Sequence, residues 1–209
     1  MVVRRQAFWA ARGAAGRVGG YGGLTTLQEC AAVTERERGF SVRPADEDDI
    51  PVLADVQLRT ALSAYADIFP PEAPAPTIEE YLDNWSHRLA RQDDGVGVFV
   101  AVEKADPTIL GLVMADPEPE IDGEGVAHGN LRGLYVDPDH WGVGIGRRLH
   151  DTAREFLRVS RPFLHTISLW VMEQNTNARA RYEDWGWQQT LDRQEIYPGI
   201  EELRYVAKQ

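Results

Sequence analysis

The chain has 209 residues, of which 43% are hydrophobic and 26% charged, and its formal net charge is −11 at pH 7. This length and composition predict a soluble protein with one well-buried domain and exclude a disordered chain. The charge is uneven, because residues 1–39 hold six Lys and Arg against three Asp and Glu, which leaves 16 against 30 in residues 40–209. An acidic body repels nucleic acid and anionic lipid and suits a cationic partner, although most acidic surfaces serve solubility alone.

The cysteine and histidine content argues against disulfides and metals. Cys30 is the only cysteine, so it cannot form a disulfide within the chain, and the five histidines are too scattered to predict a metal site. No stretch approaches the roughly 20 apolar residues that cross a bilayer. We therefore expect a cytoplasmic protein. Residues 1–39 are rich in Gly and Ala without periodicity and predict a flexible extension, with a transit peptide as the alternative.

The domain is expected to begin near Phe40 with a short strand and two helices. Asp46 offers an N-cap to the first helix, and Thr77 with Glu80 forms a capping box for the second, after the proline cluster of residues 70–76. Apolar residues fall near helical spacing in both segments: Ile50, Leu53, Leu58, Leu62 and Tyr65 in the first, then Tyr81, Leu82, Trp85 and Leu89 in the second.

The middle of the chain predicts strands. Residues 95–103 and 108–116 are β-branched runs that predict a hairpin, and residues 127–138 predict a central strand. Before this central strand, five acids from Asp116 to Glu124 alternate with Pro and Gly. We interpret this segment as a solvated loop, with an acidic rim that attracts an amine as the alternative.

The last part alternates helices and strands. We expect a helix from the loop DHWGVG to about Arg158, a strand over residues 164–172, a helix capped by Asn175 and ended by Gly186, and two edge strands around the turn Pro198-Gly199. The first of these helices should bury Ile145, Leu149, Ala153 and Phe156. The order of elements predicts an α/β fold with helices on both faces of the sheet.

The sharpest local signal is the loop between a strand and a helix that carries Gly142, Gly144 and Gly146. Glycines there let backbone N–H groups approach an anion, and the helix dipole favours negative charge. The following turn carries Arg147 and Arg148 but no acid, which also indicates an anionic ligand. The spacing fits neither the GxGxxG loop of dinucleotide-binding folds nor the GxxxxGK loop of nucleoside triphosphatases.

These residues resemble the GNAT superfamily of N-acetyltransferases, whose signature is a strand ending in VxP, a glycine loop and a helix. A second resemblance lies in LWVMEQNTNARARYEDWGW, at Asn175, Ala178, Tyr182, Gly186 and Trp187. The resemblance covers about residues 40–209. It implies a mixed, mostly antiparallel, splayed sheet of six to seven strands, with acetyl-CoA as co-substrate. It also implies direct attack, in a ternary complex, by a primary amine of a small molecule or peptide.

The resemblance also implies roles for particular residues. Tyr135 and Val136 would line the pantetheine, and Asn177 would reach its amides or lie exposed. Tyr182 would protonate the leaving thiolate, although a Tyr on this helix face alone would indicate core. The pyrophosphate would be held by Arg147 and by the backbone N–H groups of Gly142, Val143, Gly144 and Gly146.

The general base is the part that the resemblance does not supply. Asn130 stands where many relatives carry Glu, and an amide cannot accept a proton from an amine. His128 lies on the same strand face, and an imidazole pKa near 6.5 suits the task, so we name it as the candidate base. A water chain to Glu173 or to the acidic segment is the alternative. Trp141 replaces the usual Arg or Gln of the loop.

Some questions remain open from the sequence alone. If the base has been lost, the chain is a non-catalytic acyl-CoA-binding or regulatory module. The acceptor amine and the acyl chain length are not encoded in a recognisable motif, and a homodimer through the edge strands is an alternative to a monomer. Four aromatic residues either line an acceptor pocket or belong to the core: Tyr65, Phe69, Tyr81 and Trp85.

Overall fold

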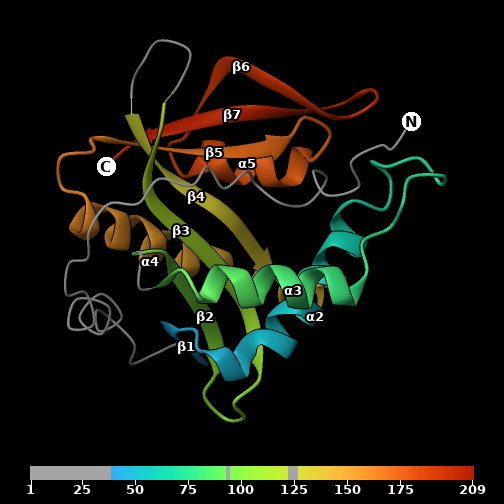
Figure 1. Cartoon of the computed structure of the whole chain (residues 1–209), viewed down its shortest axis with the longest axis vertical. Helices are drawn as coiled ribbons and strands as arrows, with labels where there is room; N and C mark the ends of the chain where they lie inside the picture. The colour runs from blue at the N-terminus through green and yellow to red at the C-terminus, as the bar shows by residue number, and fades with distance from the viewer. Residues whose placement is uncertain (1–38, 93–94, 122–126) are drawn as a thin grey trace.

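The computed structural model describes residues 39–92, 95–121 and 127–209, without the side chains of residues 117–121 and 127 (Figure 1). The extension predicted for residues 1–39 lies outside the described residues except for Gly39 and stays a prediction. The described part forms a sheet of seven strands in the order β1-β2-β3-β4-β5-β7-β6. The strands are β1 (Phe40–Pro44), β2 (Gly97–Glu103), β3 (Ile109–Ile121), β4 (Ala127–Val136), β5 (Thr166–Met172), β6 (Gln188–Tyr197) and β7 (Ile200–Lys208).

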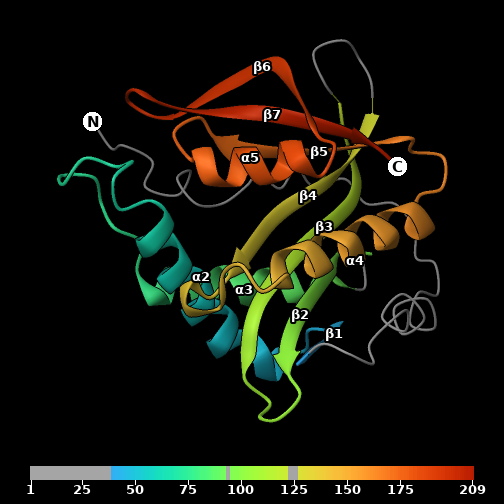
Figure 2. The ribbon, with the colours of Figure 1, turned by 180° about the vertical axis from the view of Figure 1, so that it is seen from behind.

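Every neighbouring pair of strands is antiparallel except β4 and β5, which run parallel. The predicted mixed, mostly antiparallel sheet is thus confirmed. Helices cover both faces, also as predicted: α2 (Ile50–Ala64) and α3 (Ile78–Leu89) lie side by side on one, and α4 (Ile145–Ser160) lies on the other (Figures 1 and 2). The short α5 (Thr176–Asp184) packs on the α4 side, since Tyr182 shares a core cluster with Leu149 and Phe156 of α4.

The helix α2 begins later and buries a different face than the hydrophobic pattern predicts. Asp46 caps a single 3-10 turn, η1 (Glu47–Asp49), and α2 then starts at Ile50. Leu62, expected in the buried stripe, is 54% exposed, whereas the polar Gln57 and Thr60 are buried. Both have partners, because Gln57 accepts a hydrogen bond from Trp85 Nε1 at 2.8 Å and Thr60 donates one to the Val136 carbonyl at 3.0 Å. Hydrogen bonding removes the cost of burying them.

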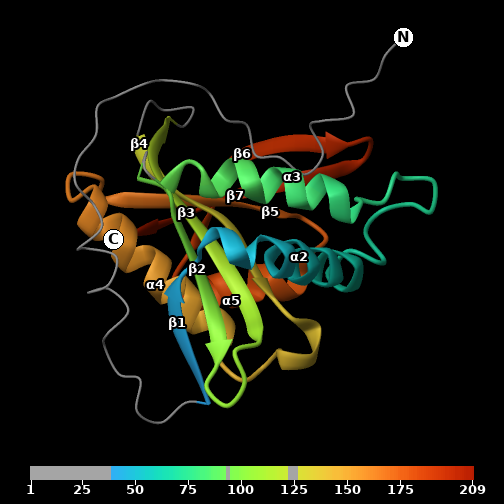
Figure 3. The same cartoon turned by 60° about the horizontal axis from the view of Figure 1, so that its bottom comes forward.

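The helix α3 follows the prediction closely. Thr77 and Glu80 form the expected capping box, with hydrogen bonds of 3.3 and 3.0 Å. Tyr81 and Trp85 are 1% and 0% exposed and pack between α2 and the sheet, so both belong to the core and not to a pocket. Figure 3 shows the two helices next to each other along the sheet.

The acidic segment after Asp116 is not a solvated loop, at least as far as Ile121. The strand β3 continues through it and pairs with β4, with Glu120 opposite His128 and Ile121 opposite Ala127. The register is irregular between Asp116 and Glu120, where two prolines that cannot donate to the ladder occur. Pairing with a long neighbouring strand outweighs the local preference for a turn. Asp122 and Glu124 lie outside the described residues.

The sheet opens between β4 and β5. These two strands pair only at Gly129 with Ile167 and at Asn130 with Ser168, whereas β3 follows β4 as far as Val136. From Leu131 onward β4 therefore has an open edge that faces β5, and we call this gap the seam. A bulge lies beside it, since Met114 pairs with Gly133 and Ala115 with Leu131, which leaves Arg132 as the extra residue of β4.

Candidate active site

The glycine loop meets the open end of the seam. Gly142 and Gly144 have φ angles of 83° and 93°, in the left-handed region that favours glycine. Gly144 is the N-cap of α4, no side chain caps the helix, and its first turn holds no acid. The N–H groups of a first helical turn have no partner within the helix. They and the helix dipole thus favour an anion at this place, as the sequence predicts.

Gly146 and the flanking residues give the loop its shape. A Cβ on Gly146 would lie 3.6 Å from Val136 and 3.8 Å from Trp185, which is ordinary contact. A side chain would therefore fit there, and the fold itself does not require glycine at this position. Val143 and Trp141 are exposed. The indole of Trp141 donates a hydrogen bond of 2.7 Å to the Val136 carbonyl and so ties the loop to the end of β4.

Arg147 lies beside the loop and has a partner that the sequence argument overlooked. Its Nε donates to both carboxylate oxygens of Asp151 at 3.0 Å, one turn along α4, and its guanidinium lies 5.7 Å from the Trp185 ring. The side chain is still 48% exposed. The ion pair orients Arg147 without burying it.

His150 extends this network into the core. Trp187 Nε1 donates to His150 Nε2 at 2.9 Å, so His150 carries its proton on Nδ1 and can donate it to Asp151 Oδ1, also at 2.9 Å. Burial lowers the pKa of His150 and keeps the imidazole neutral, against the opposing pull of Asp151. The sequence analysis did not single out His150. The sequence signal that could have indicated His150 is its position next to Leu149, which the helical pattern predicts to be buried.

Tyr182 and Tyr135 approach the seam from its two sides. Tyr182 is 9% exposed and packs edge-on against Trp185 and Trp187, at centroid distances of 5.8 and 5.9 Å. Burial raises the pKa of Tyr182, and the nearby Tyr135 raises it further. Asn175 caps α5 through a 3.1 Å bond from the Ala178 N–H, and Asn177 is exposed in the first turn of that helix.

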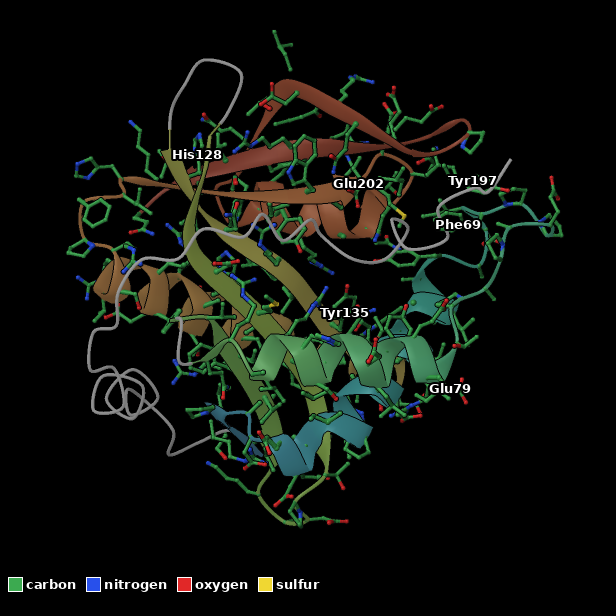
Figure 4. All side chains as sticks on the ribbon, viewed as in Figure 1. Phe69, Glu79, His128, Tyr135, Tyr197 and Glu202 are labelled. Carbon is green, nitrogen blue, oxygen red and sulfur yellow. The ribbon has the colours of Figure 1, made fainter. Side chains whose placement is uncertain are left out.

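His128 lies at the other end of β4. It is buried, and it precedes Gly129 and Asn130, where β4 and β5 are joined, whereas Tyr135 follows them (Figure 4). Asn130 is buried too and accepts a 3.0 Å hydrogen bond from Ser168, which pins the two strands where the seam begins. The structure thus brings Tyr135, Val136, the glycine loop and Tyr182 together and places His128 beyond the pinned residues.

A carboxylate that the sequence analysis did not single out lies on β7, across the seam from β4. Glu202 of β7 pairs in register with Met172 at the end of β5, and its Oε2 accepts a 2.8 Å hydrogen bond from Gln194 of β6. Burial raises the pKa of Glu202, and the Gln194 bond opposes the shift. Glu202 in turn raises the pKa of Tyr65 and of Tyr135, in both of which burial is the larger cause.

An aromatic contact closes one side of this region. Tyr65 at the end of α2 packs edge-on against Phe69 at 6.4 Å, and Phe69 packs edge-on against Tyr197 of β6 at 6.0 Å. Figure 4 shows Phe69 and Tyr197 next to each other where the α2–α3 connection meets the β6–β7 hairpin. We call these three residues the aromatic bridge. Tyr65 and Phe69 therefore lie outside the core cluster that buries Tyr81 and Trp85, and a role in an acceptor pocket stays a prediction for them.

Several neighbouring groups shift the pKa of Tyr135. Burial raises its pKa most, Arg88 of α3 and a hydrogen bond with Gln57 lower it, and Glu202 raises it. Tyr135 is thus influenced by a guanidinium from one helix and a carboxylate from a strand on the other side of the seam.

The described residues offer neither a metal site nor a membrane-spanning helix. Within residues 39–92, 95–121 and 127–209 no three His, Cys, Asp or Glu side chains gather in a way that would hold a metal ion. The helices of this described part are each too short or too polar to cross a membrane.

Comparison with known proteins identifies the class of this site. The sequence profile of the Acetyltransferase (GNAT) family matches residues 59–187, well over half of the chain. The chain therefore belongs to the GNAT acetyltransferase family, as the two motifs predicted, and it is an enzyme of the N-acetyltransferase type. No curated protein matches its sequence.

Solved structures share the fold. An N-acetyltransferase, PaiA, from Thermoplasma acidophilum in complex with coenzyme A is 17% identical, with a TM-score of 0.64 over 82% of this chain and 100% of the other. A ribosomal-protein-alanine N-acetyltransferase from Brucella melitensis is 20% identical, with a TM-score of 0.60 over 80% and 99%. The putative acetyltransferase yncA from Salmonella typhimurium, solved with acetyl-CoA, is 18% identical, with a TM-score of 0.57 over 82% and 94%. At these identities the likeness establishes the fold alone.

Proposed function

We propose that the chain transfers the acetyl group of acetyl-CoA to a primary amine of a small molecule or peptide by direct attack in a ternary complex. The observation that carries this is the seam, which opens from Leu131 onward and ends at a helix start that has no side-chain cap and no acid in its first turn. An extended chain with a pyrophosphate at one end fits such a place. Relatives with this fold were solved with coenzyme A or acetyl-CoA.

In this proposal the cofactor lies along the open edge of β4. Tyr135 and Val136 line the pantetheine, and the exposed Asn177 is within reach of its amides from α5. Arg147, oriented by Asp151, adds positive charge beside the pyrophosphate. The N–H groups of the loop bind the phosphate oxygens at Gly142, Val143, Gly144 and Gly146.

The reaction needs a base for the amine and a proton for the leaving thiolate. An alkyl ammonium has a pKa of about 10 and a thiol one of about 8.5, so at neutral pH the amine must first be deprotonated. Tyr182 keeps its proton at every physiological pH, because burial raises its pKa. It donates a hydrogen bond to the sulfur as charge develops there, and the apolar surroundings that raise the pKa of Tyr182 also favour protonation of the thiolate.

The base is not assigned to His128 in this proposal. Gly129 and Asn130 join β4 to β5 between His128 and the seam, so its imidazole lies away from the place where the thioester would lie. His128 stays a prediction from the sequence, and its substitution by Gln tests that prediction directly.

The experiment that tests the proposed function measures two quantities on the wild-type chain. Calorimetry gives the affinity for acetyl-CoA, and release of free thiol with a panel of amines, checked by mass spectrometry of the products, gives turnover. Binding together with turnover supports the proposal. Binding without turnover on any amine would instead indicate a non-catalytic acyl-CoA-binding module, and no binding would remove the assignment of the seam.

A further inference from the structure

Glu202 lies on the same face of the sheet as Tyr135. Side chains alternate along β7, and Leu203 and Tyr205 belong to the core cluster on the α4 side. Glu202 and Arg204 therefore face the side covered by α2 and α3. Tyr135 faces the same side, since it packs on the core cluster that contains Tyr81 and Trp85 of α3.

The surroundings of Glu202 suit a group that gives up a proton. Gln194 of β6 donates a hydrogen bond to Oε2 of Glu202, and no group of the described residues donates one to Oε1. Glu202 raises the pKa of Tyr65, which follows α2, and of Tyr135 on β4, although burial is the larger cause in both. Arg204, the nearest cation on the same face of β7, contacts Asp192 at 3.5 Å and Ser168 at 3.3 Å, and so is engaged elsewhere.

We propose that Glu202 receives the ammonium group of the acceptor and takes its proton before the attack on the thioester. This inference rests on the proposed function. The carboxylate attracts the cation, and we assign the packing against the rest of the molecule to the aromatic bridge, whose Tyr197 belongs to the same β6–β7 hairpin as Glu202. The substrate class is thus a primary alkyl amine that is protonated in solution.

The step balances in protons and electrons. Glu202 accepts one proton from the ammonium, and the nitrogen lone pair then forms the N–C bond to the thioester carbon. The C–S bond breaks and its electrons stay on sulfur. The second proton leaves the nitrogen and reaches the thiolate through Tyr182, so the products are the amide, free CoA thiol and one proton on Glu202.

The pH dependence follows from the same surroundings. Glu202 acts only when ionised, so activity falls as pH drops through its pKa. Because burial raises that pKa above the usual value for Glu, the fall should begin at a higher pH than an exposed carboxylate would give. A base with a raised pKa also accepts the proton of an ammonium more readily.

The test is Glu202→Gln, which keeps the size of the side chain and an oxygen for Gln194. We expect kcat/KM for an alkyl amine to fall about 100-fold, with the acid limb of the pH profile lost. The affinity for acetyl-CoA should change less than about twofold, because Glu202 is not among the residues assigned to the cofactor. Glu201→Gln is the matched control: Glu201 is the adjacent acid, pairs with Arg193 at 3.0 Å and should leave kcat/KM unchanged.

A second acceptor separates proton removal from structural damage. Methoxyamine is largely unprotonated at neutral pH, so it needs no base, and the deficit of Glu202→Gln should shrink to less than about tenfold with it. If Glu202→Gln does not fold, Glu202→Asp keeps the charge and should retain an acid limb at reduced rate.

Three outcomes would overturn the inference while leaving the proposed function intact. They are a wild-type kcat/KM and acid limb in Glu202→Gln, an equal deficit with both amines, or loss of the acid limb in His128→Gln instead. Absence of turnover by the wild-type chain on every amine would contradict the proposed function itself. This result is obtained before any variant is measured, so the two failures can be told apart.

Discussion

The two sides of the seam are built differently. The proposed cofactor side consists of β4, the glycine loop, α4 and α5, which lie within residues 127–184 and are interrupted only by β5. The proposed acceptor side combines Tyr65 and Phe69, from the connection after α2, with Tyr197 of β6 and Glu202 of β7. The first is a local structure and the second is assembled from distant segments.

This difference teaches where each kind of specificity resides. A local strand, loop and helix can bind the same cofactor in any chain that keeps its few backbone requirements. An acceptor site made from separate segments changes whenever one of them changes. Substitutions on the cofactor side should therefore affect acetyl-CoA binding, and those on the acceptor side should affect only the amine.

The largest effect is expected at Gly144. Its φ of 93° strains any other residue, and Asp would add a carboxylate where the phosphates are expected. We expect Gly144→Asp to weaken acetyl-CoA binding more than about 100-fold by calorimetry, since loss of the close approach and charge repulsion act together. Gly144→Asn has the same shape without the charge and should lose less. Gly199→Asp, at another positive φ of 78°, controls for backbone strain. Unchanged affinity in a folded Gly144→Asp variant would contradict the assignment of the glycine loop to acetyl-CoA binding.

Tyr182→Phe is expected to have the next largest effect. The ring stays buried between Trp185 and Trp187, and only the hydroxyl is lost. We expect kcat to fall about 10- to 100-fold, the low end of general acid catalysis because a thiolate is a tolerable leaving group. Acetyl-CoA affinity should hardly change, since the hydroxyl acts mainly in the transition state. Tyr81→Phe in the core serves as the control. Wild-type kcat in Tyr182→Phe would show that Tyr182 is only a packing residue.

Arg147→Met sharpens the assignment of the loop. The side chain is about half exposed and already paired with Asp151, so its interaction with a phosphate is screened by solvent. We expect acetyl-CoA affinity to fall about threefold to tenfold at low salt and less at high salt. Arg158→Met, at the far end of α4 and paired with Glu155, should have no effect. An equal loss in both variants would mean that the general charge of α4, and not Arg147, attracts the cofactor.

The smallest effect is expected on the acceptor side. Phe69→Leu removes the edge-on contacts with Tyr65 and Tyr197 but keeps an apolar side chain. We expect KM for the best amine to rise about threefold, which corresponds to a modest aromatic contribution, while acetyl-CoA affinity stays constant. Phe163→Leu, exposed and remote, is the control. A change in acetyl-CoA affinity would show that the two sides are not separate.

Much of the cofactor side was predictable because its determinants are adjacent in sequence. Glycine at positive φ, Asn175 as the cap of α5 and Gly186 at its end each depend on the conformation of a few neighbouring residues. The central strand and the buried stripe of α4 follow from the spacing of apolar residues, and the stripe is buried as expected. Such signals need no knowledge of the rest of the chain.

The failures had the opposite cause. The buried face of α2 depends on two distant partners. Trp85 donates a hydrogen bond to Gln57, and the Val136 carbonyl accepts one from Thr60, so both polar side chains can enter the core. Residues after Asp116 extend β3 because β4 lies beside them. In each case a partner far along the chain overrode the local preference.

The sequence by itself determined the fold class and the family, since these depend on short periodic patterns and on two motifs in the right order, and it predicted the anion-binding loop. Only the tertiary structure decided that His128 lies beyond the pinned end of the seam and that Glu202 shares a sheet face with Tyr135. The physical reason is register: a strand residue changes its face and its neighbours with a shift of one position, and hydrogen bonds between strands, not the residues themselves, set that position.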